Sequence, residues 1–224
     1  MSIHLSKRLQ AVADIVPQDA HVIDVGTDHA MIPVWLAQTG RASHIWASDI
    51  RPGPLQSAQK LIKETDTGNC IRTRLTDGLQ GFDASDGDTI ILAGMGGETM
   101  ISILDAAPWV RCGTLLILEP QSKQAELRTW LLENSFSILH ESLVKDAGRI
   151  YPILSAKQGI PQLHTEAELL TGRYDALAEN EYFAEYLDIL LHRLLSAAPY
   201  DSKASVVFQE VTSMKERYMH EHSQ

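Results

Sequence analysis

Short apolar segments alternate with helical patterns along the first two thirds of this sequence, and this alternation limits the possible folds more than any other feature. The apolar segments lie at residues 21–26, 44–50, 71–78, 88–97 and 113–120. The helical patterns lie at residues 5–16, 31–40, 51–65, 98–107 and 122–135. The apolar segments lack a strict polar alternation, which is typical of strands that are buried on both faces. Strands that alternate with helices predict a parallel sheet with right-handed crossovers.

The pattern changes at residues 137–158, which we predict to be two strands joined by a turn at Asp146, Ala147 and Gly148. Five parallel strands that end in an antiparallel hairpin are the arrangement of one doubly wound sheet, that of the S-adenosylmethionine (SAM) methyltransferases. We therefore predict an α/β protein with the Rossmann-like sheet of class I SAM-dependent methyltransferases over residues 1–159. Because a fold does not establish a function, the functional hypothesis depends on the residues at the strand ends.

The composition shifts after residue 159, where two apolar stripes with helical spacing cover residues 182–195 and 204–218. A turn is predicted between them at residues 199–202. Eleven acidic and five basic residues give the segment from residue 160 onward a net charge of −6. The stripes are shorter than an extended coiled coil requires. We predict a second domain at residues 160–224 that forms a C-terminal antiparallel helical hairpin with coiled-coil-like packing.

Bulk composition narrows the class of protein. A hydrophobic content of 44% favours a packed globular chain. No apolar run reaches the roughly 18 residues that a membrane helix needs, and the first residues lack a signal-peptide core, so we expect a cytoplasmic protein without a membrane partner. Cys70 and Cys112 have no metal-ligand spacing, which predicts free thiols and no metal site. The net charge of −10 disfavours non-specific nucleic-acid binding through total charge, although a local basic patch would not show in this sum.

The early strands end in carboxylates or glycines. Asp24, Asp49 and Asp77 end the first three, and glycines at 94, 96 and 97 end the fourth. Ligands of doubly wound sheets bind at the carboxyl ends of the strands, where an acid after the second strand suits the two hydroxyls of a ribose. An acid beside a backbone amide after the third strand suits the exocyclic amine of adenine. These positions predict a ligand that contains adenosine.

The first turn distinguishes between adenosine ligands. A diphosphate needs a glycine-rich helix N-terminus, because backbone N–H groups must approach the anion. This turn has only Gly26 and adds Asp28, which would repel a diphosphate. A nucleotide-dependent oxidoreductase would carry G-x-G-x-x-G where this chain has G-T-D-H-A-M. SAM has cationic sulfonium and amino groups and no phosphate, so an acidic turn fits it better.

Each of these features also has a purely structural interpretation. Asp49 could cap the helix that follows it, and Asp77 with Gly78 could form a plain turn. His29 could be a structural histidine, and the glycines at 94–97 could serve close packing of a helix on a strand. Their order on successive strands favours the ligand-binding interpretation.

Several motifs resemble those of the bacterial tRNA (adenine-N1)-methyltransferases of the TrmK family, which modify the adenine at position 22 of certain tRNAs. They are LSKRL at 5–9, DVGTDHAMIP at 24–33, DGL at 77–79, AGMGG at 93–97 and LRTWL at 127–131. The similarity continues to the hairpin with Tyr151 and covers about two thirds of the chain. The resemblance implies a Rossmann-like catalytic domain followed by a helical domain, with SAM as cofactor and tRNA as partner. One departure lies at the end of the fifth strand. There the family carries a Gln-Pro pair, and this chain has Glu119 followed by Pro120.

The resemblance also implies roles for individual residues. The cofactor-binding set is Asp24, Gly26, Asp49, Ile50, Asp77, Gly78 and Gly94. The segment after the fourth strand would line the pocket of the target base. There Met95 would pack on the face of the base, and Gly96 and Gly97 would let the backbone approach it.

Methylation of adenine N1 requires the ring nitrogen in line with the methyl–sulfur bond of SAM, and this alignment should account for most of the rate. The alkylated base is cationic, so a nearby carboxylate could stabilise it or take the N6 proton. Asp28 is the first candidate and His29 the second, although Asp28 could instead face the SAM amino group. Because N1 lies on the Watson–Crick edge, the adenine must first be exposed. Lys7 and Arg8 would contact tRNA phosphates if they lie at the carboxyl edge of the sheet, and otherwise they are scattered solubilising charges.

Two other functions remain open at this point. The chain could be a SAM-dependent methyltransferase for a small molecule or a protein, which the acidic C-terminal helices would allow. It could also be a non-catalytic SAM-binding module, against which the intact acids at three strand ends argue. The sequence leaves open which tRNAs are used, which residue is the general base and what the acidic hairpin does, and it favours a monomer.

Overall fold

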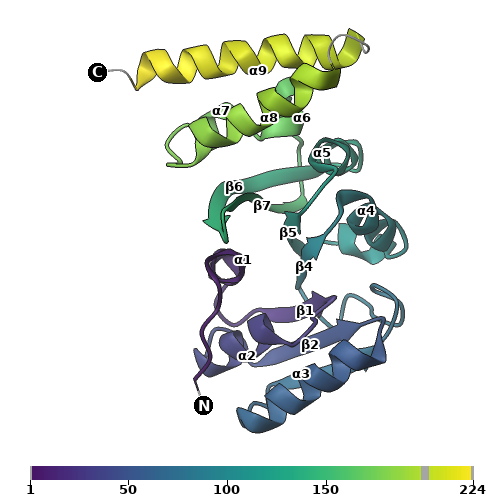
Figure 1. Cartoon of the computed structure of the whole chain (residues 1–224). Coiled ribbons are helices and arrows are strands. Elements are labelled where there is room, and N and C mark those ends of the chain that lie inside the picture. The colour runs from purple at the N-terminus through teal and green to yellow at the C-terminus, as the bar shows by residue number, and fades with distance from the viewer. Residues whose placement is uncertain (1, 198–201, 223–224) are drawn as a thin grey trace.

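The computed structural model describes residues 2–197 and 202–222, and a seven-stranded sheet runs through its centre (Figure 1). The strands are β1 (His21–Val25), β2 (His44–Asp49), β3 (Ile71–Leu75), β4 (Thr89–Met95), β5 (Leu115–Pro120), β6 (Phe136–Asp146) and β7 (Arg149–Gln158). Their order is β3-β2-β1-β4-β5-β7-β6. The first five strands are parallel, and β7 is antiparallel to both β5 and β6. The predicted parallel sheet with a terminal hairpin is therefore confirmed.

Helices cover both faces of the sheet. They are α1 (Lys7–Ile15), α2 (Met31–Gln38), α3 (Pro52–Glu64), α4 (Gly97–Asp105), the 3-10 helix η1 (Pro108–Arg111) and α5 (Gln124–Glu133). Successive side chains of a strand point to opposite faces, so Val22 and Ile91 share a core with α1, α2 and α3. Ile23 and Ile90 share a second core with α4 and α5. Burial on both faces explains why these strands lack a polar alternation.

Local chemistry sets the ends of several helices. The hydroxyl of Ser6 caps α1 by accepting a hydrogen bond from the backbone amide of Leu9 at 3.4 Å. Pro52 begins α3, a position where the missing N–H has no helical partner in any case. The turns after β1, β2 and β4 all open at the carboxyl edge of the sheet, which is where the site lies.

The C-terminal helices are α6 (Glu166–Thr171), α7 (Tyr174–Leu177), α8 (Phe183–Ala197) and α9 (Ser202–Glu221). The long helices α8 and α9, which were predicted, pack against each other at the top of Figure 1. Of the predicted turn at 199–202, residues 199–201 lie outside the described residues. The short helices α6 and α7 were not predicted. The core of the C-terminal helices also includes Leu143 of β6, so the division of the chain after residue 159 remains a prediction.

A buried ion pair joins these helices to the sheet. The Nε of Arg128 in α5 donates to the Oε1 of Glu141 in β6 at 2.8 Å, and the two side chains are only 1% and 3% exposed. The Nη1 of Arg128 donates to the carbonyl of Leu169 in α6 at 3.0 Å. The other carboxylate oxygen of Glu141 accepts from the backbone amide of Arg173 at 2.9 Å. The pair therefore anchors the segment of α6 and α7 on the sheet.

Two further properties concern the whole described part of the chain. No helix in residues 2–197 and 202–222 is both long and apolar enough to cross a membrane. Within the same ranges, no three or more His, Cys, Asp or Glu side chains are grouped so that they could hold a metal ion. Cys70 and Cys112 are free thiols.

Candidate active site

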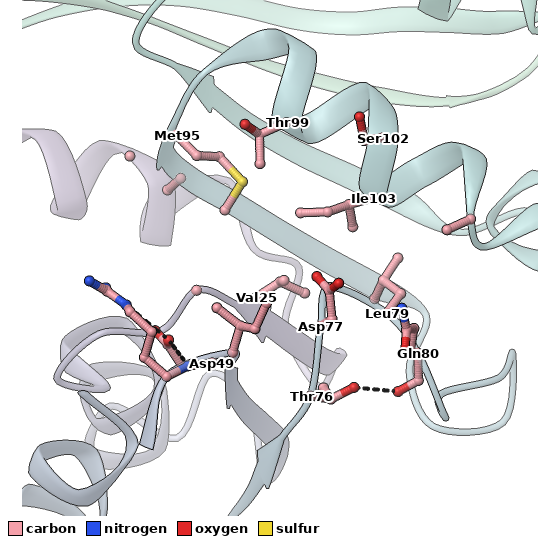
Figure 2. A pocket seen from close by; sticks show the side chains of 17 residues that line it. Val25, Asp49, Thr76, Asp77, Leu79, Gln80, Met95, Thr99, Ser102 and Ile103 are labelled. Atoms are coloured by element: carbon pink, nitrogen blue, oxygen red, sulfur yellow. Dashed lines mark hydrogen bonds and ion pairs between the residues drawn. The ribbon is translucent and has the colours of Figure 1, made fainter. Parts of the chain in front are cut away.

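Two adjacent pockets lie at the carboxyl edge of the sheet. The first, of about 420 Å³, lies between the ends of β2 and β3 and the helix α4 (Figure 2). The second, of about 310 Å³, lies beside the turn after β1 and the start of α1. Gly26, Arg51, Ala93 and Gly94 line both pockets. One elongated ligand can therefore extend from the first pocket into the second.

The first pocket contains the acids that were predicted to bind adenosine. Asp49 ends β2, is 4% exposed, and accepts a hydrogen bond from the backbone amide of Arg51 at 2.8 Å, so its carboxylate is held in place. Figure 2 shows Asp49 and Asp77 on the wall opposite α4. Apolar side chains form much of the remaining wall, among them Val25, Leu79 and Ile103. Two carboxylates beside apolar walls suit a sugar attached to a planar base.

Asp24 is the buried acid of the second pocket. It is 5% exposed, and its Oδ2 accepts a hydrogen bond from the hydroxyl of Thr27 at 2.6 Å. Burial raises the pKa of Asp24 from 3.8 to about 7, the charge of Asp49 acts in the same direction, and the Thr27 hydrogen bond opposes them. At neutral pH this carboxyl can therefore either hold a proton or pair with a cation.

The turn between β1 and α2 has an uncommon backbone conformation. Asp28 and Ala30 have φ angles of 52° and 56°, in the left-handed region that non-glycine residues rarely adopt. The side chains of Asp28 and His29 are 64% and 59% exposed, and the His29 Nε2 lies 3.7 Å from the Asp28 Oδ2. Both residues line the second pocket, so both can reach a ligand there. Such strained turns cluster at functional sites.

Known proteins resemble this chain in sequence and in structure. The family model described as "Methyltransferase domain" matches residues 5–154. A Streptococcus pneumoniae protein solved in complex with S-adenosyl-L-methionine has a TM-score of 0.86 and 30% identity, covering 95% of this chain and 100% of that one. The crystal structure of the Bacillus subtilis M1A22 tRNA methyltransferase TrmK has a TM-score of 0.79 and 26% identity, covering 98% of this chain and 99% of that one.

The curated sequence of the Bacillus subtilis tRNA (adenine(22)-N(1))-methyltransferase is 30% identical over 220 residues, which are 96% of this chain and 92% of that protein. This chain belongs to the TrmK family. The family resemblance of the motifs is therefore confirmed, as is the methyltransferase fold. The roles of individual site residues depend on the geometry of the two pockets.

Among the residues assigned to SAM, the structure brings six together in the first pocket: Gly26, Asp49, Ile50, Asp77, Gly78 and Gly94. Asp24 lies in the second pocket, beside Gly26 and Gly94. Gly26 has a φ angle of 72°, and a Cβ added there would lie 3.1 Å from the Cε of Met95. A side chain at this position would therefore be strained and would crowd the junction of the two pockets.

Met95 was predicted to pack on the face of the target base, and this role remains a prediction. Its side chain extends from β4 into the first pocket, as Figure 2 shows, and it does not line the second pocket. The pairing of β4 with β5 shifts between Ala93 and Met95, and Gly94 between them has a φ angle of 79°. A local irregularity of this kind turns the next side chain in a new direction, which the sequence alone does not reveal.

Gly96 and Gly97 were predicted to let the backbone approach the target base, and this role also remains a prediction. Neither glycine lines either pocket. The amide of Gly97 donates to the carbonyl of Ser122 at 2.8 Å, and a Cβ added at Gly97 would lie 2.3 Å from the carbonyl oxygen of Lys123. The contacts of both glycines agree with the other interpretation given above, in which they allow close packing. The β4–α4 turn lies directly on the β5–α5 turn.

Lys7 and Arg8 both lie at the start of α1, next to the carboxyl edge of the sheet. Lys7 is exposed, and its role as a phosphate contact remains a prediction. The same role of Arg8 also remains a prediction, and its Nη1 donates to the buried Oε2 of Glu119 at 2.6 Å. The positive charge of Arg8 is therefore paired with the negative charge of Glu119, and the Arg8 side chain lines the second pocket.

Sequence reasoning missed several residues of the pockets. From α4, Thr99, Ser102 and Ile103 line the first pocket, and no local motif marks them. Gln121, just after β5, lines the second pocket. Thr27 could have been found, because a hydroxyl three residues after a buried strand-end acid is well placed to hydrogen-bond it.

Proposed function

We propose that this chain transfers the methyl group of SAM to N1 of adenine 22 in tRNA, the reaction for which its Bacillus subtilis relative is named. One observation carries the proposal. Three strand-end acids, Asp24, Asp49 and Asp77, surround two joined pockets in a chain that matches this enzyme over nearly its whole length.

The geometry suits SAM laid across both pockets. The ribose hydroxyls bind Asp49, and the adenine lies between the apolar walls with its amine near Asp77. The sulfonium then lies at the junction beside Gly26 and Gly94, and the SAM amino group reaches Asp24. The complex of the Streptococcus pneumoniae relative with S-adenosyl-L-methionine supports this choice of cofactor.

The remaining space of the second pocket receives the target adenine after it leaves its stack. SAM supplies an activated methyl group, so the protein mainly has to align N1 with the methyl–sulfur bond. The exposed carboxylate of Asp28 lies where the methylated, cationic ring forms, and it stabilises that charge. His29, 3.7 Å from Asp28, is the second candidate for accepting the N6 proton.

The first test is mass spectrometry of nucleosides after purified protein is incubated with SAM and unmodified bacterial tRNA. We expect new 1-methyladenosine with the wild-type protein. We expect none with Asp24→Ala, which removes the partner of the SAM amino group. A protein that binds SAM but methylates no nucleoside in any tRNA would contradict the proposed function and favour a small-molecule or protein substrate.

The raised pKa of Asp24 predicts that SAM binding depends on pH. Below about pH 7 the carboxyl of Asp24 is mostly protonated, whereas pairing with the SAM ammonium requires the carboxylate. We therefore expect SAM affinity to fall as the pH decreases below this value. At about pH 6.5, where an α-amino group is already ionised, roughly three quarters of a proton should be released per SAM bound. Calorimetry in buffers of different ionisation enthalpy measures this proton.

Asp24→Asn is the matched control for this proton, because it keeps the shape of the side chain and cannot titrate. We expect its SAM binding to be weaker and to release no proton from this position. Proton release that is the same in Asp24→Asn and in the wild-type protein would assign the titration to another group.

We further propose that the enzyme works in the cytoplasm as a monomer, with a catalytic domain at 1–159 and a helical domain at 160–224. Light scattering on the purified protein measures the oligomeric state directly. A stable dimer at the concentrations used for activity would contradict this part of the proposal.

A further inference from the structure

One side-chain amide lines the second pocket. Among the described residues that line this pocket, Gln121 alone is an asparagine or a glutamine. It follows β5 directly, and the residue is exposed. Its side-chain amide makes no hydrogen bond with any residue in the ranges 2–197 and 202–222. The amide oxygen and the amide nitrogen are therefore both available to a ligand, one as an acceptor and the other as a donor.

The backbone of Gln121 is fixed to the turn that follows β4. Pro120 pairs with Met95, and the backbone amide of Gln121 donates to the carbonyl of Met95 at 3.0 Å. The carbonyl of the next residue, Ser122, accepts from the amide of Gly97 at 2.8 Å. The contacts between β4 and β5 thus continue past the ends of both strands. Only the rotatable bonds of the Gln121 side chain remain to be ordered when a ligand binds.

The side-chain amide lies at the junction of the two pockets. A Cβ placed on Gly94 would lie 3.8 Å from the Nε2 of Gln121, and Gly94 lines both pockets. In the arrangement proposed above, the sulfonium of SAM lies at this junction. The Gln121 amide can therefore reach the base that receives the methyl group.

Other polar side chains of the second pocket differ from Gln121 in chemistry. Arg8 has donors only, and an ionised Asp28 has acceptors only. The hydroxyl of Thr27 donates to Asp24 at 2.6 Å. Gln121 presents a donor and an acceptor side by side in one plane. It therefore suits the edge of a base on which an acceptor lies next to a donor.

We propose that Gln121 identifies the target base as adenine, an inference that rests on the proposed function. Its Oε1 accepts a hydrogen bond from the N6 amino group, and its Nε2 donates to N7. The Watson–Crick edge has to face the methyl group of SAM, so the protein reads the base along another edge. Adenine presents N6–H and N7 together on its Hoogsteen edge, and glutamine matches them with two hydrogen bonds. Guanine has two acceptors there, and one of them would face the Gln121 oxygen.

The same contact orients the ring. Two hydrogen bonds fix the rotation of the base in its plane, so that N1 and no other ring nitrogen faces the methyl group. The N6 amino group has two hydrogens, and the one on the N7 side binds Gln121. The other hydrogen, on the N1 side, stays free for Asp28 or His29.

The effect on the rate comes from alignment. The bond between the methyl carbon and sulfur breaks as the bond between that carbon and N1 forms, and the sulfur keeps the electron pair. The positive charge moves to the adenine ring, which makes N6–H a stronger donor and N7 a weaker acceptor. These two changes oppose each other, so Gln121 acts mainly by holding N1 in line with the methyl–sulfur bond. Gln121 itself exchanges no proton.

The test combines a change in the protein with a change of one atom in the tRNA. Gln121→Met keeps the length of the side chain and removes both hydrogen-bonding groups. A tRNA assembled with 7-deazaadenosine at position 22 lacks the N7 acceptor but keeps N1 and N6. Single-turnover methylation at saturating SAM and tRNA is measured for the four combinations. With ordinary tRNA, we expect Gln121→Met to be slower than the wild-type protein by about tenfold to a hundredfold, the value of a bidentate base contact.

The coupling between the two changes is the decisive measurement. We expect 7-deazaadenosine to slow the wild-type protein by about three- to tenfold more than it slows Gln121→Met, because the variant has no donor to lose. The intrinsic effect of the modified base on N1 is the same for both proteins and cancels in this ratio.

Two further measurements control for general effects. The Kd of SAM should change by less than about twofold in Gln121→Met, because the lost contact belongs to the base. Gln124→Met is the matched variant at the start of α5. Gln124 lines neither pocket, and its side chain makes one long hydrogen bond, to the carbonyl of Pro120 at 3.4 Å. Gln124→Met should keep the wild-type rate and the wild-type response to 7-deazaadenosine.

An equal effect of 7-deazaadenosine on the wild-type protein and on Gln121→Met would overturn the proposal, even with a slow variant, because a purely structural role of Gln121 does not depend on N7. A wild-type rate of Gln121→Met on ordinary tRNA would overturn it as well. A wild-type protein that makes no 1-methyladenosine from ordinary tRNA would instead contradict the proposed function.

Discussion

Glu141→Ala is expected to lower the free energy of unfolding by about 3–5 kcal/mol, because it leaves the guanidinium of Arg128 buried without a counterion. Arg128 is 1% exposed, so water cannot replace the lost carboxylate without opening the contact between α5, β6 and α6. The backbone amide of Arg173 would lose its acceptor at the same time. Urea denaturation at neutral pH, followed by circular dichroism, measures the change.

Two variants control for this effect. Glu185→Ala removes the exposed ion pair between Lys145 and Glu185, whose side chains are 36% and 47% exposed, and should cost no more than about 1 kcal/mol. The double variant Arg128→Met/Glu141→Leu removes both charges and should recover most of the stability that Glu141→Ala loses. Equal costs for Glu141→Ala and Glu185→Ala would show that the buried pair does not anchor the C-terminal helices.

Gly97→Ala is expected to reduce methyl transfer by at least about a hundredfold, the cost of a reacting group moved by about 1 Å. The added Cβ would lie 2.3 Å from the carbonyl oxygen of Lys123 and 3.1 Å from that of Ser122. Both neighbours are backbone atoms, so no rotamer change can relieve the contact, and the β4–α4 turn must move away from the β5–α5 turn. Gly94, which lines both pockets, would move with it.

The same variant should lose about 1–3 kcal/mol of stability, as is typical of overpacking. Gly53→Ala is the matched control, because it also lies in the first turn of a helix and no atom lies within 4 Å of its added Cβ. We expect Gly53→Ala to keep the wild-type rate of 1-methyladenosine formation and the wild-type melting temperature. A Gly97→Ala protein with the wild-type rate would show that the contact between the two turns does not control the site.

Much of the first pocket was predictable because its residues follow strand ends. Asp49 and Asp77 are 28 positions apart in the sequence, and both line the first pocket. Parallel strands bring their carboxyl ends to one edge, so recognising the strands was enough to bring the acids together. Met95 was not predictable in the same way, because the register shift between β4 and β5 redirects its side chain.

The second pocket depended on contacts that no local pattern contains. Glu119 and Arg8 are separated by 111 positions, and α1 must pack beside β5 before they can meet. On an isolated helix, Arg8 would be a free surface charge. In the folded chain it is paired, because the buried carboxylate of Glu119 lies against its guanidinium group. Similarly, nothing near Gly97 in the sequence indicates that the backbone of Lys123 lies against it.

The sequence by itself determined the parallel sheet with its terminal hairpin, the two long C-terminal helices and the strand-end acids, because these follow from periodicity and from the order of neighbouring elements. It also carried the motifs of the TrmK family. Only the tertiary structure decided that Met95 faces the first pocket, that Gly96 and Gly97 lie against the turn after β5, and that Glu119 holds Arg8 at the second. The reason is physical: these outcomes depend on how close several separate elements approach, and that distance is set by the packing of the whole core.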